Sequence, residues 1–145
     1  MIATASDSIR FNAPNAWRPA TTAAGIVLSL GEVLVFGIGD SRVYGIDKAG
    51  VSQLTVDHRS RTDSRAITRF LGGEHAQSIP DIRTLSTTIW LGFLICTDGF
   101  YAHLTTIELG IFRELDPKIA LINLMDVALE RGSTDNLTAV YVSTN

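Results

Sequence analysis

Short uncharged stretches that end in glycine and acidic residues shape the middle of the chain. Residues 90–96 (Trp-Leu-Gly-Phe-Leu-Ile-Cys) carry no charge, and Asp98 and Gly99 follow closely. A short apolar run closed by turn residues is typical of a strand buried on both faces. The pattern predicts that this strand brings the Asp98 carboxylate to the rim of the core. Asp-Gly is also a common turn dipeptide, so a turn with no further role is the alternative.

Other apolar runs predict a series of antiparallel strands. Residues 24–30 and 33–38 flank a Gly-Glu step, which predicts a hairpin whose turn uses the positive φ available to Gly31. The run 33–38 is nearly all apolar, so we expect it at the centre of a sheet. Strands over 42–46 and 51–55 follow, and the hairpin links between successive strands predict a meander.

The second half of the chain contains strand and helix signals. Residues 80–88 alternate loosely and predict a strand beside 90–96, while the apolar positions of 66–71 favour a helix. Thr105 and Glu108 fit a capping box at the start of a short helix. A longer helix is predicted by four features: Asp116 as N-cap, Pro117 as first residue, an apolar stripe, and Gly132 beyond its end. The alternating run 137–142 predicts a last strand.

These elements predict one α+β domain with antiparallel sheet over residues 20–145, preceded by an irregular N-terminal arm over 1–19. Apolar residues make up 46% of the 145 positions and charged residues 19%, a globular balance. The net charge of −3 argues against a nucleic-acid partner, and no apolar run approaches the roughly 20 residues of a membrane span. The lone Cys96 is expected to be a buried thiol, and we expect a cytoplasmic location.

Three acidic residues share one position relative to the predicted strands. Asp40 and Asp98 each follow a strand, and Asp135 precedes another. If these strands are neighbours, the carboxylates meet at one edge of the sheet. Carboxylates gathered in one place repel one another unless a cation neutralises them, so convergence would favour a metal site.

Five motifs occur in an order that identifies a family. The chain resembles the metal-dependent serine/threonine phosphatases of type 2C (PPM) through segments 39–44 (Gly-Asp-Ser-Arg-Val-Tyr), 54–58 (Leu-Thr-Val-Asp-His), 67–73 (Ile-Thr-Arg-Phe-Leu-Gly-Gly), 96–99 (Cys-Thr-Asp-Gly) and 132–138 (Gly-Ser-Thr-Asp-Asn-Leu-Thr).

The resemblance implies a β-sandwich of two antiparallel sheets flanked by helices. It also implies hydrolysis of phosphoserine and phosphothreonine esters by a water held between two Mg²⁺ or Mn²⁺ ions. By motif, Asp98 and Asp135 correspond to ligands of one catalytic ion and Asp40 to a ligand of a more weakly held ion. Asn136 is expected to shape its turn, and His58 to fix the turn after a strand.

The chain also departs from the family pattern. No Asp-Gly-x-Gly-Gly motif, whose Asp bridges both ions in the family, occurs in it, and Ala102 stands where the family has an acid. We therefore expect a phosphatase-like domain that is impaired or inactive alone, with a weak, vestigial Mg²⁺ or Mn²⁺ site. The alternatives are a pseudophosphatase that binds or regulates a phosphoprotein or other protein partner, and a fragment completed by a partner chain. A homo-oligomer is a further possibility because sheet edges would be left unpaired.

A group of arginines has two interpretations. Guanidinium groups bind phosphate in a bidentate manner, so the basic stretch that follows His58 is a candidate phosphopeptide site. A solvated basic face is the simpler interpretation. The stretch contains Arg59, Arg61, Arg65 and Arg69.

Overall fold

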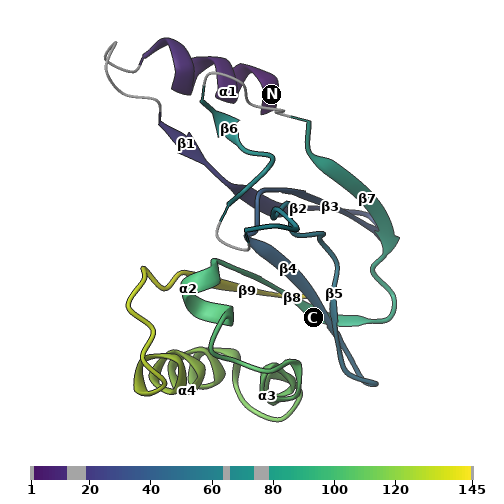
Figure 1. Cartoon of the computed structure of the whole chain (residues 1–145). Coiled ribbons are helices and arrows are strands. Elements are labelled where there is room, and N and C mark those ends of the chain that lie inside the picture. The colour runs from purple at the N-terminus through teal and green to yellow at the C-terminus, as the bar shows by residue number, and fades with distance from the viewer. Residues whose placement is uncertain (1, 13–18, 64–65, 74–78, 145) are drawn as a thin grey trace.

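A computed structural model describes residues 2–12, 19–63, 66–73 and 79–144 of the chain. It has two stacked antiparallel sheets with helices on the outer face of one of them (Figure 1). The elements in chain order are α1 (Ile2–Phe11), β1 (Ala20–Thr21), β2 (Ala23–Ser29), β3 (Glu32–Ile38), β4 (Arg42–Asp47), β5 (Val51–Gln53), β6 (Leu71–Gly72), β7 (Asp81–Ser86), β8 (Trp90–Cys96), α2 (Asp98–Tyr101), α3 (Thr106–Leu109), the 3₁₀ helix η1 (Gly110–Arg113), α4 (Pro117–Glu130) and β9 (Ala139–Ser143).

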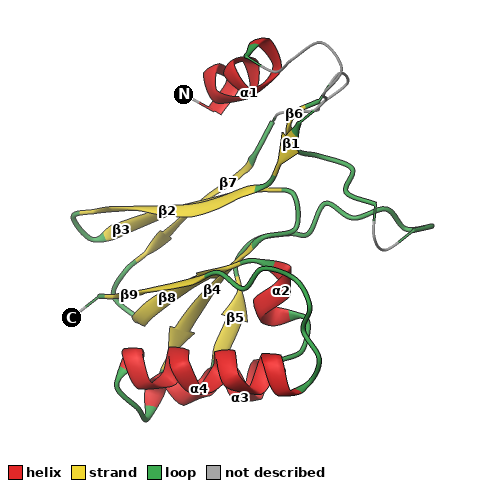
Figure 2. Ribbon diagram, turned by 90° about the vertical axis from the view of Figure 1, so that its left-hand side faces the viewer, coloured by secondary structure: helices red, strands yellow, loops and turns green. Residues whose placement is uncertain are grey.

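The strands form a three-stranded sheet in the order β2-β3-β7, a four-stranded sheet in the order β5-β4-β8-β9, and a small β1-β6 pair. All pairings are antiparallel. Figure 2 shows the two larger sheets as layers, with α3 and α4 below the four-stranded one. This confirms the expected α+β fold with antiparallel sheets flanked by helices.

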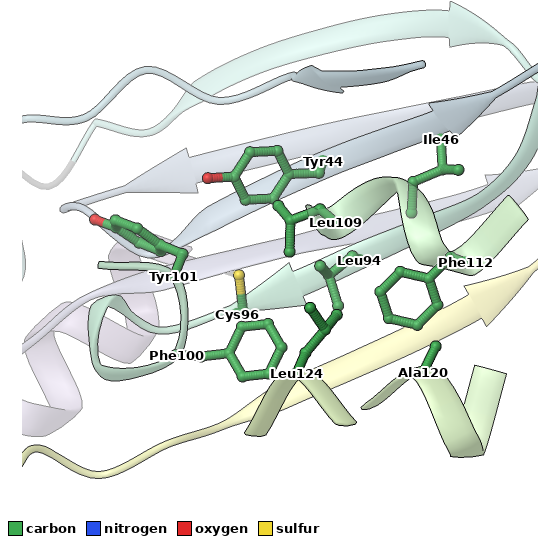
Figure 3. Close-up of a cluster of buried hydrophobic side chains, with 10 residues drawn as sticks. All are labelled: Tyr44, Ile46, Leu94, Cys96, Phe100, Tyr101, Leu109, Phe112, Ala120 and Leu124. Carbon is green, nitrogen blue, oxygen red and sulfur yellow. The ribbon is translucent and has the colours of Figure 1, made fainter. Parts of the chain in front are cut away.

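Two apolar layers, one on each face of the four-stranded sheet, bury the central residues of β4 and β8. Successive side chains of a strand point to opposite faces, so Val43 and Phe93 enter the layer between the two sheets, while Tyr44 and Leu94 enter the layer between the four-stranded sheet and the helices. The helix-side layer is drawn in Figure 3 and contains Tyr44, Ile46, Leu94, Cys96, Phe100, Tyr101, Leu109, Phe112, Ala120 and Leu124. The prediction of a strand buried on both faces is therefore confirmed for β8.

The predicted helix ends are confirmed in detail. Thr105 and Glu108 form the capping box of α3, and the Asp116 carboxylate accepts from two backbone N–H groups in the first turn of α4. Gly132, at φ 88°, follows the end of α4. Its N–H donates to Leu129, and the N–H of Ser133 donates to the carbonyl of Ala128, the pairing of a Schellman motif.

The expectation of an irregular arm over residues 1–19 is wrong for Ile2–Phe11, which form helix α1. Contacts with residues far along the chain hold this helix. The buried Ser6 hydroxyl accepts from the N–H of Gly72, and the Arg10 side chain donates to the carbonyl of Gly73. The local sequence of residues 2–11 is polar and predicts no helix. The helix packs against β6, which lies more than sixty residues away in sequence, so the local pattern does not reveal this contact.

Three local expectations are also wrong. The strand predicted over 80–88 is β7, which pairs with β3 rather than β8. The chain does not continue as a meander from β3 to β4, because it passes from one sheet to the other at Gly39, at φ 96°. The stretch 66–71 forms no helix in its described residues, since Ile67 bridges Arg59 and Leu71 enters β6.

The hairpin turn is displaced by one residue. Because Ser29 faces Glu32, the turn residues are Leu30 and Gly31 rather than a Gly-Glu pair. Gly31 has the predicted positive φ, 79°, at the second turn position.

Candidate functional site

The three acidic residues singled out in the sequence lie at one end of the four-stranded sheet. Arg42 of β4 faces Cys96 of β8, and Cys96 faces Ala139 of β9. Asp40 lies two residues before β4, and Asp98 begins α2 two residues after the end of β8. Asp135 lies in the loop between α4 and β9, four residues before that strand. The adjacency of β4, β8 and β9 therefore confirms the condition on which the predicted convergence depended.

Asp135 reaches this edge because its loop docks on the start of α2. Thr97 N–H donates to the carbonyl of Thr138, and the Thr97 hydroxyl donates to that of Asn136. Gly99 permits the approach, since a Cβ there would lie 2.5 Å from the Asn136 carbonyl oxygen. Asp135 Oδ1 accepts from the N–H of Asn136 at 2.7 Å, so it is the Asp135 side chain that makes the local turn contact.

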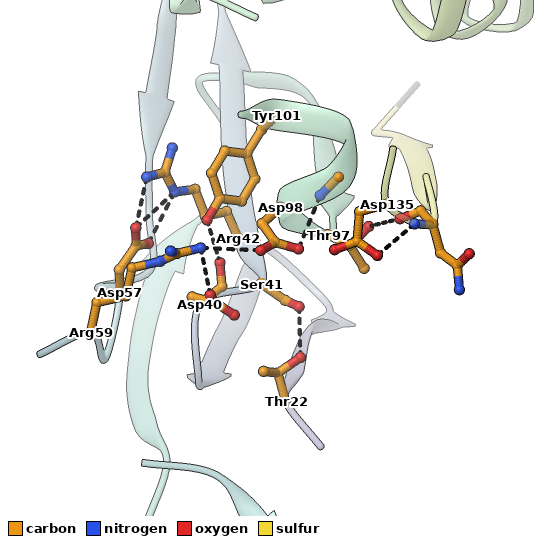
Figure 4. Close-up of polar contacts among 12 residues, drawn as sticks. Thr22, Asp40, Ser41, Arg42, Asp57, Arg59, Thr97, Asp98, Tyr101 and Asp135 are labelled. Atoms are coloured by element: carbon orange, nitrogen blue, oxygen red, sulfur yellow. Dashed lines mark hydrogen bonds and ion pairs between the residues drawn. The ribbon is translucent and has the colours of Figure 1, made fainter. Parts of the chain in front are cut away.

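Asp40 and Asp98 share one arginine. Nη2 of Arg59 lies 2.6 Å from Asp40 Oδ2 and 3.2 Å from Asp98 Oδ2 (Figure 4). The Asp40 side chain is 7% exposed, against 39% for Asp98. Burial raises the pKa of Asp40, and the charge of Arg59 acts in the opposite direction. The cation that faces these carboxylates is therefore a guanidinium.

A second arginine supports the site from behind. Arg42 forms a bidentate pair with Asp57, with Nη2 2.6 Å from Oδ2. Its guanidinium carbon lies 3.7 Å from the ring centroid of Tyr101. The Tyr101 hydroxyl donates to the carbonyl of Asp40 at 2.9 Å and is hydrogen-bonded by Arg59. Burial raises the pKa of Tyr101 to about 12, so its proton stays in place at neutral pH.

His58 fixes the Gly39–Asp40 loop, as the sequence predicted. The ring Nδ1 of His58 accepts from the backbone N–H of Gly39, and the backbone N–H of His58 donates to the Gly39 carbonyl. Because Nδ1 accepts, a neutral ring has its proton on Nε2, which faces Asp81 Oδ2 at 2.9 Å and lies 2.8 Å from Arg69 Nη1. Asp81 also pairs with Arg69. His58 is thus tied between two elements of the three-stranded sheet.

The basic stretch after His58 is not a free phosphate-binding face in the residues that the structure describes. Arg59 and Arg69 are paired with carboxylates, and Arg61 is exposed. Arg65 lies outside the described residues. Cys96 is buried, and burial raises the pKa of its thiol to about 12, in line with the expectation of an unreactive thiol.

The family resemblance implies two metal ions here, and the side chains as placed do not fit such a centre. Two of the three predicted ligands are paired with Arg59, and one carboxylate oxygen of Asp135 accepts from the backbone N–H of Asn136. No group of three or more Asp, Glu, His or Cys side chains suited to a metal ion occurs among the described residues. The sequence pointed to Arg59 only as part of a basic stretch after the Asp-His motif and did not indicate that it pairs with Asp40 and Asp98.

Comparisons with known proteins place the fold. The structure of the *S. agalactiae* serine/threonine phosphatase aligns with a TM-score of 0.85 at 18% identity, covering 99% of this chain and 68% of that one. Stp1 from *Staphylococcus aureus* aligns at 0.76 and 22%, with coverages of 87% and 57%. The catalytic domain of PstP, solved with two manganese ions, aligns at 0.71 and 22%, with coverages of 86% and 58%.

The chain therefore spans less than two thirds of the length of Stp1, of the PstP domain and of another bacterial serine phosphatase, of which it covers 58%. A search among curated proteins gave no match. No helix in the described part of the chain has the length and apolar character needed to cross a membrane. The sequence model of protein phosphatase 2C matches residues 8–139, which is most of the chain. The chain belongs to the protein phosphatase 2C family.

Proposed function

We propose that this chain is a phosphatase 2C domain with little or no phosphatase activity of its own. The observation that supports the proposal best is the shared ion pair of Arg59 with Asp40 and Asp98. Phosphoester hydrolysis by metal-activated water requires carboxylates that are free to hold ions. In this chain, two of the three available carboxylates hold a guanidinium, and no bridging Asp-Gly-x-Gly-Gly motif is present.

The experiment is a phosphatase assay on the purified chain with Mn²⁺ or Mg²⁺. An aryl phosphate and a phosphoserine or phosphothreonine peptide serve as substrates. We expect turnover close to the protein-free rate. Robust turnover by the wild-type chain that is lost in Asp98→Ala would contradict the proposal and show that the chain is an active phosphatase.

A weak divalent-ion site at Asp98 and Asp135, assisted by Asp40, is the second part of the proposal. Mg²⁺ and Mn²⁺ keep several water ligands and need few carboxylates, so binding near the millimolar range is expected, about −4 kcal/mol. Mn²⁺ should bind more tightly than Mg²⁺. Calorimetry on the wild type, Asp98→Asn and Asp135→Asn measures the site, and equal binding in all three would assign both residues to turns alone.

A binding or regulatory role is the alternative function, with a phosphoprotein, another protein or a completing chain as partner. Unpaired sheet edges support it. β2 is at the edge of its sheet and β9 at the edge of the other, and neither contains a charge or a proline. Pull-down with a phosphopeptide, or with a separately expressed family N-terminal segment, distinguishes these partners. We propose a cytoplasmic location for the chain.

A further inference from the structure

Arg59 lies where a bound cation would be expected. A single nitrogen, Nη2, contacts one carboxylate oxygen of Asp40 and one of Asp98. Figure 4 shows the side chain extending between the two acids, which come from different strand ends. The guanidinium therefore neutralises two carboxylates that would otherwise repel each other in a partly buried place.

The backbone that carries Arg59 is firmly anchored on both sides. The backbone N–H of the preceding residue, His58, donates to the Gly39 carbonyl, and the His58 carbonyl accepts from the N–H of Thr68. The following residue, Ser60, donates its N–H to Ala66, and Arg59 itself bridges Ile67 in antiparallel pairing. This short ladder fixes the backbone from which the side chain starts, so the ion pair requires ordering of the side chain alone.

The head of the side chain is held as well. The guanidinium donates to the Tyr101 hydroxyl oxygen, and that hydroxyl donates to the carbonyl of Asp40. Only 29% of the Arg59 side chain is exposed. An arginine with two acidic contacts, an aromatic partner and an anchored backbone is a built part of the site, unlike Arg61, which is exposed on the same segment.

We infer that Arg59 is a built-in cation of this site, which stabilises Asp40 and Asp98 without metal and competes with divalent ions for the same carboxylates. Removal of Arg59 alone leaves the buried Asp40 charge uncompensated, which is strongly destabilising. Removal of both charges relieves that penalty. The inference rests on the proposed metal site only for its second measurement.

The first measurement is the thermal unfolding of metal-free protein in EDTA. Arg59→Gln is expected to lower the unfolding midpoint, and Asp40→Asn combined with Arg59→Gln is expected to be more stable than Arg59→Gln alone. Arg61→Gln is the matched control and should leave the midpoint unchanged. If Arg59→Gln does not fold, the double variant still should. A double variant that is no more stable than Arg59→Gln would overturn the inference.

The second measurement is calorimetric titration of Mn²⁺ alone. Arg59→Gln is expected to bind Mn²⁺ at least about tenfold more tightly than the wild type, a difference of about 1.4 kcal/mol, while Arg61→Gln binds as the wild type does. Equal affinity, or no binding, in Arg59→Gln and wild type would overturn the competition. Phosphatase turnover is read separately, so an active wild-type chain would contradict the proposed function without deciding the role of Arg59.

Discussion

At the scale of single residues, His58 shows how one buried side chain sets the geometry of the acidic site. It is 6% exposed and bonds to Gly39 and Asp81 through its two ring nitrogens. Without the ring, the buried N–H of Gly39 would lose its acceptor and Asp81 would lose a donor. An unsatisfied buried donor costs more than a typical hydrogen bond contributes.

The first prediction follows from these contacts. His58→Ala should lower the free energy of unfolding by about 2–4 kcal/mol, from the orphaned donor and the cavity combined. Urea unfolding at pH 7 measures the change, with His103→Ala as control. A loss of unfolding free energy below about 0.5 kcal/mol, the size typical of surface substitutions, would contradict the role of His58 in fixing the loop.

Sequence reasoning reached some residues of the site and missed others for a physical reason. Asp40, Asp98 and Asp135 were found because each is adjacent to a strand, and strand ends can be located from apolar runs. Arg59 was left with two interpretations, since its partners are set by the loop ladder around Ile67 and by the crossing from one sheet to the other. Such contacts have no local pattern in the sequence.

At the scale of elements, the helix-side layer depends on two capped helices. Asp116 accepts from the N–H groups of Lys118 and Ile119 at the start of α4. These groups have no partner within the helix, so the cap satisfies donors that would otherwise depend on water. Local rules of this kind are visible in the sequence, which is why the start and end of α4 were predicted correctly.

The second prediction concerns this cap. Asp116→Ala should destabilise the protein by about 1 kcal/mol. Asp126→Ala, an exposed acid within the same helix, is the matched control and should change stability by less than about 0.5 kcal/mol. Chemical denaturation compares the two variants, and equal losses would mean that capping does not account for the effect.

The third prediction concerns the link between α3 and the end of α4. Glu108 pairs with Arg131, which, with its bonds to Thr105, lowers the pKa of Glu108 to about 2 from its ordinary 4.5. Because the folded pKa is the lower one, the unfolded chain binds the proton more tightly in this range. The contribution to stability is complete above the ordinary pKa and disappears as the pH falls toward 2.

Urea unfolding of the wild type and Glu108→Gln at several pH values tests this dependence. The stability difference between them should be constant from pH 7 to about 5.5 and then shrink as the pH is lowered through the range between the two pKa values. A difference that stays constant down to pH 2.5 would contradict the ion pair as its cause.

At the scale of the whole molecule, one side of the sandwich is bounded by free strand edges. A cavity with residues of both sheets in its lining lies beside β2 and includes Thr22, Ala24, Ile95 and Val140. Within the described residues β2 pairs with β3 alone, so on its other edge no described strand takes up its N–H and C=O groups. Its sequence, Ala-Ala-Gly-Ile-Val-Leu-Ser, has none of the charges or prolines that protect edges.

The fourth prediction is that the chain associates through this edge, as a dimer, a higher oligomer or an aggregate. Val27, 55% exposed on β2, is the place to interrupt it. Val27→Lys should reduce association in light scattering at high concentration, while Ile107→Lys, 87% exposed on α3, should not. A wild-type chain that stays monomeric would mean that the edge does not recruit a second copy.

The broad architecture could be predicted because it depends on patterns that repeat along the chain, such as the continuous apolar runs of β3 and β8. What could not be predicted is how these strands divide between sheets. β7 pairs with β3 and not with its neighbour in sequence, β8, because β4 and β9 pair with the two edges of β8. The position of α1 against β6 likewise depends on contacts between residues far apart in the sequence.

The central claim is that this chain has the phosphatase 2C fold but little or no phosphatase activity. The most direct test is one Mn²⁺ titration of the wild-type chain, in which calorimetry measures binding and hydrolysis of an aryl phosphate measures turnover. We predict binding near the millimolar range and turnover that stays at the protein-free rate at every Mn²⁺ concentration. Micromolar binding, with turnover that rises in step with occupancy and is lost in Asp98→Ala, would contradict it.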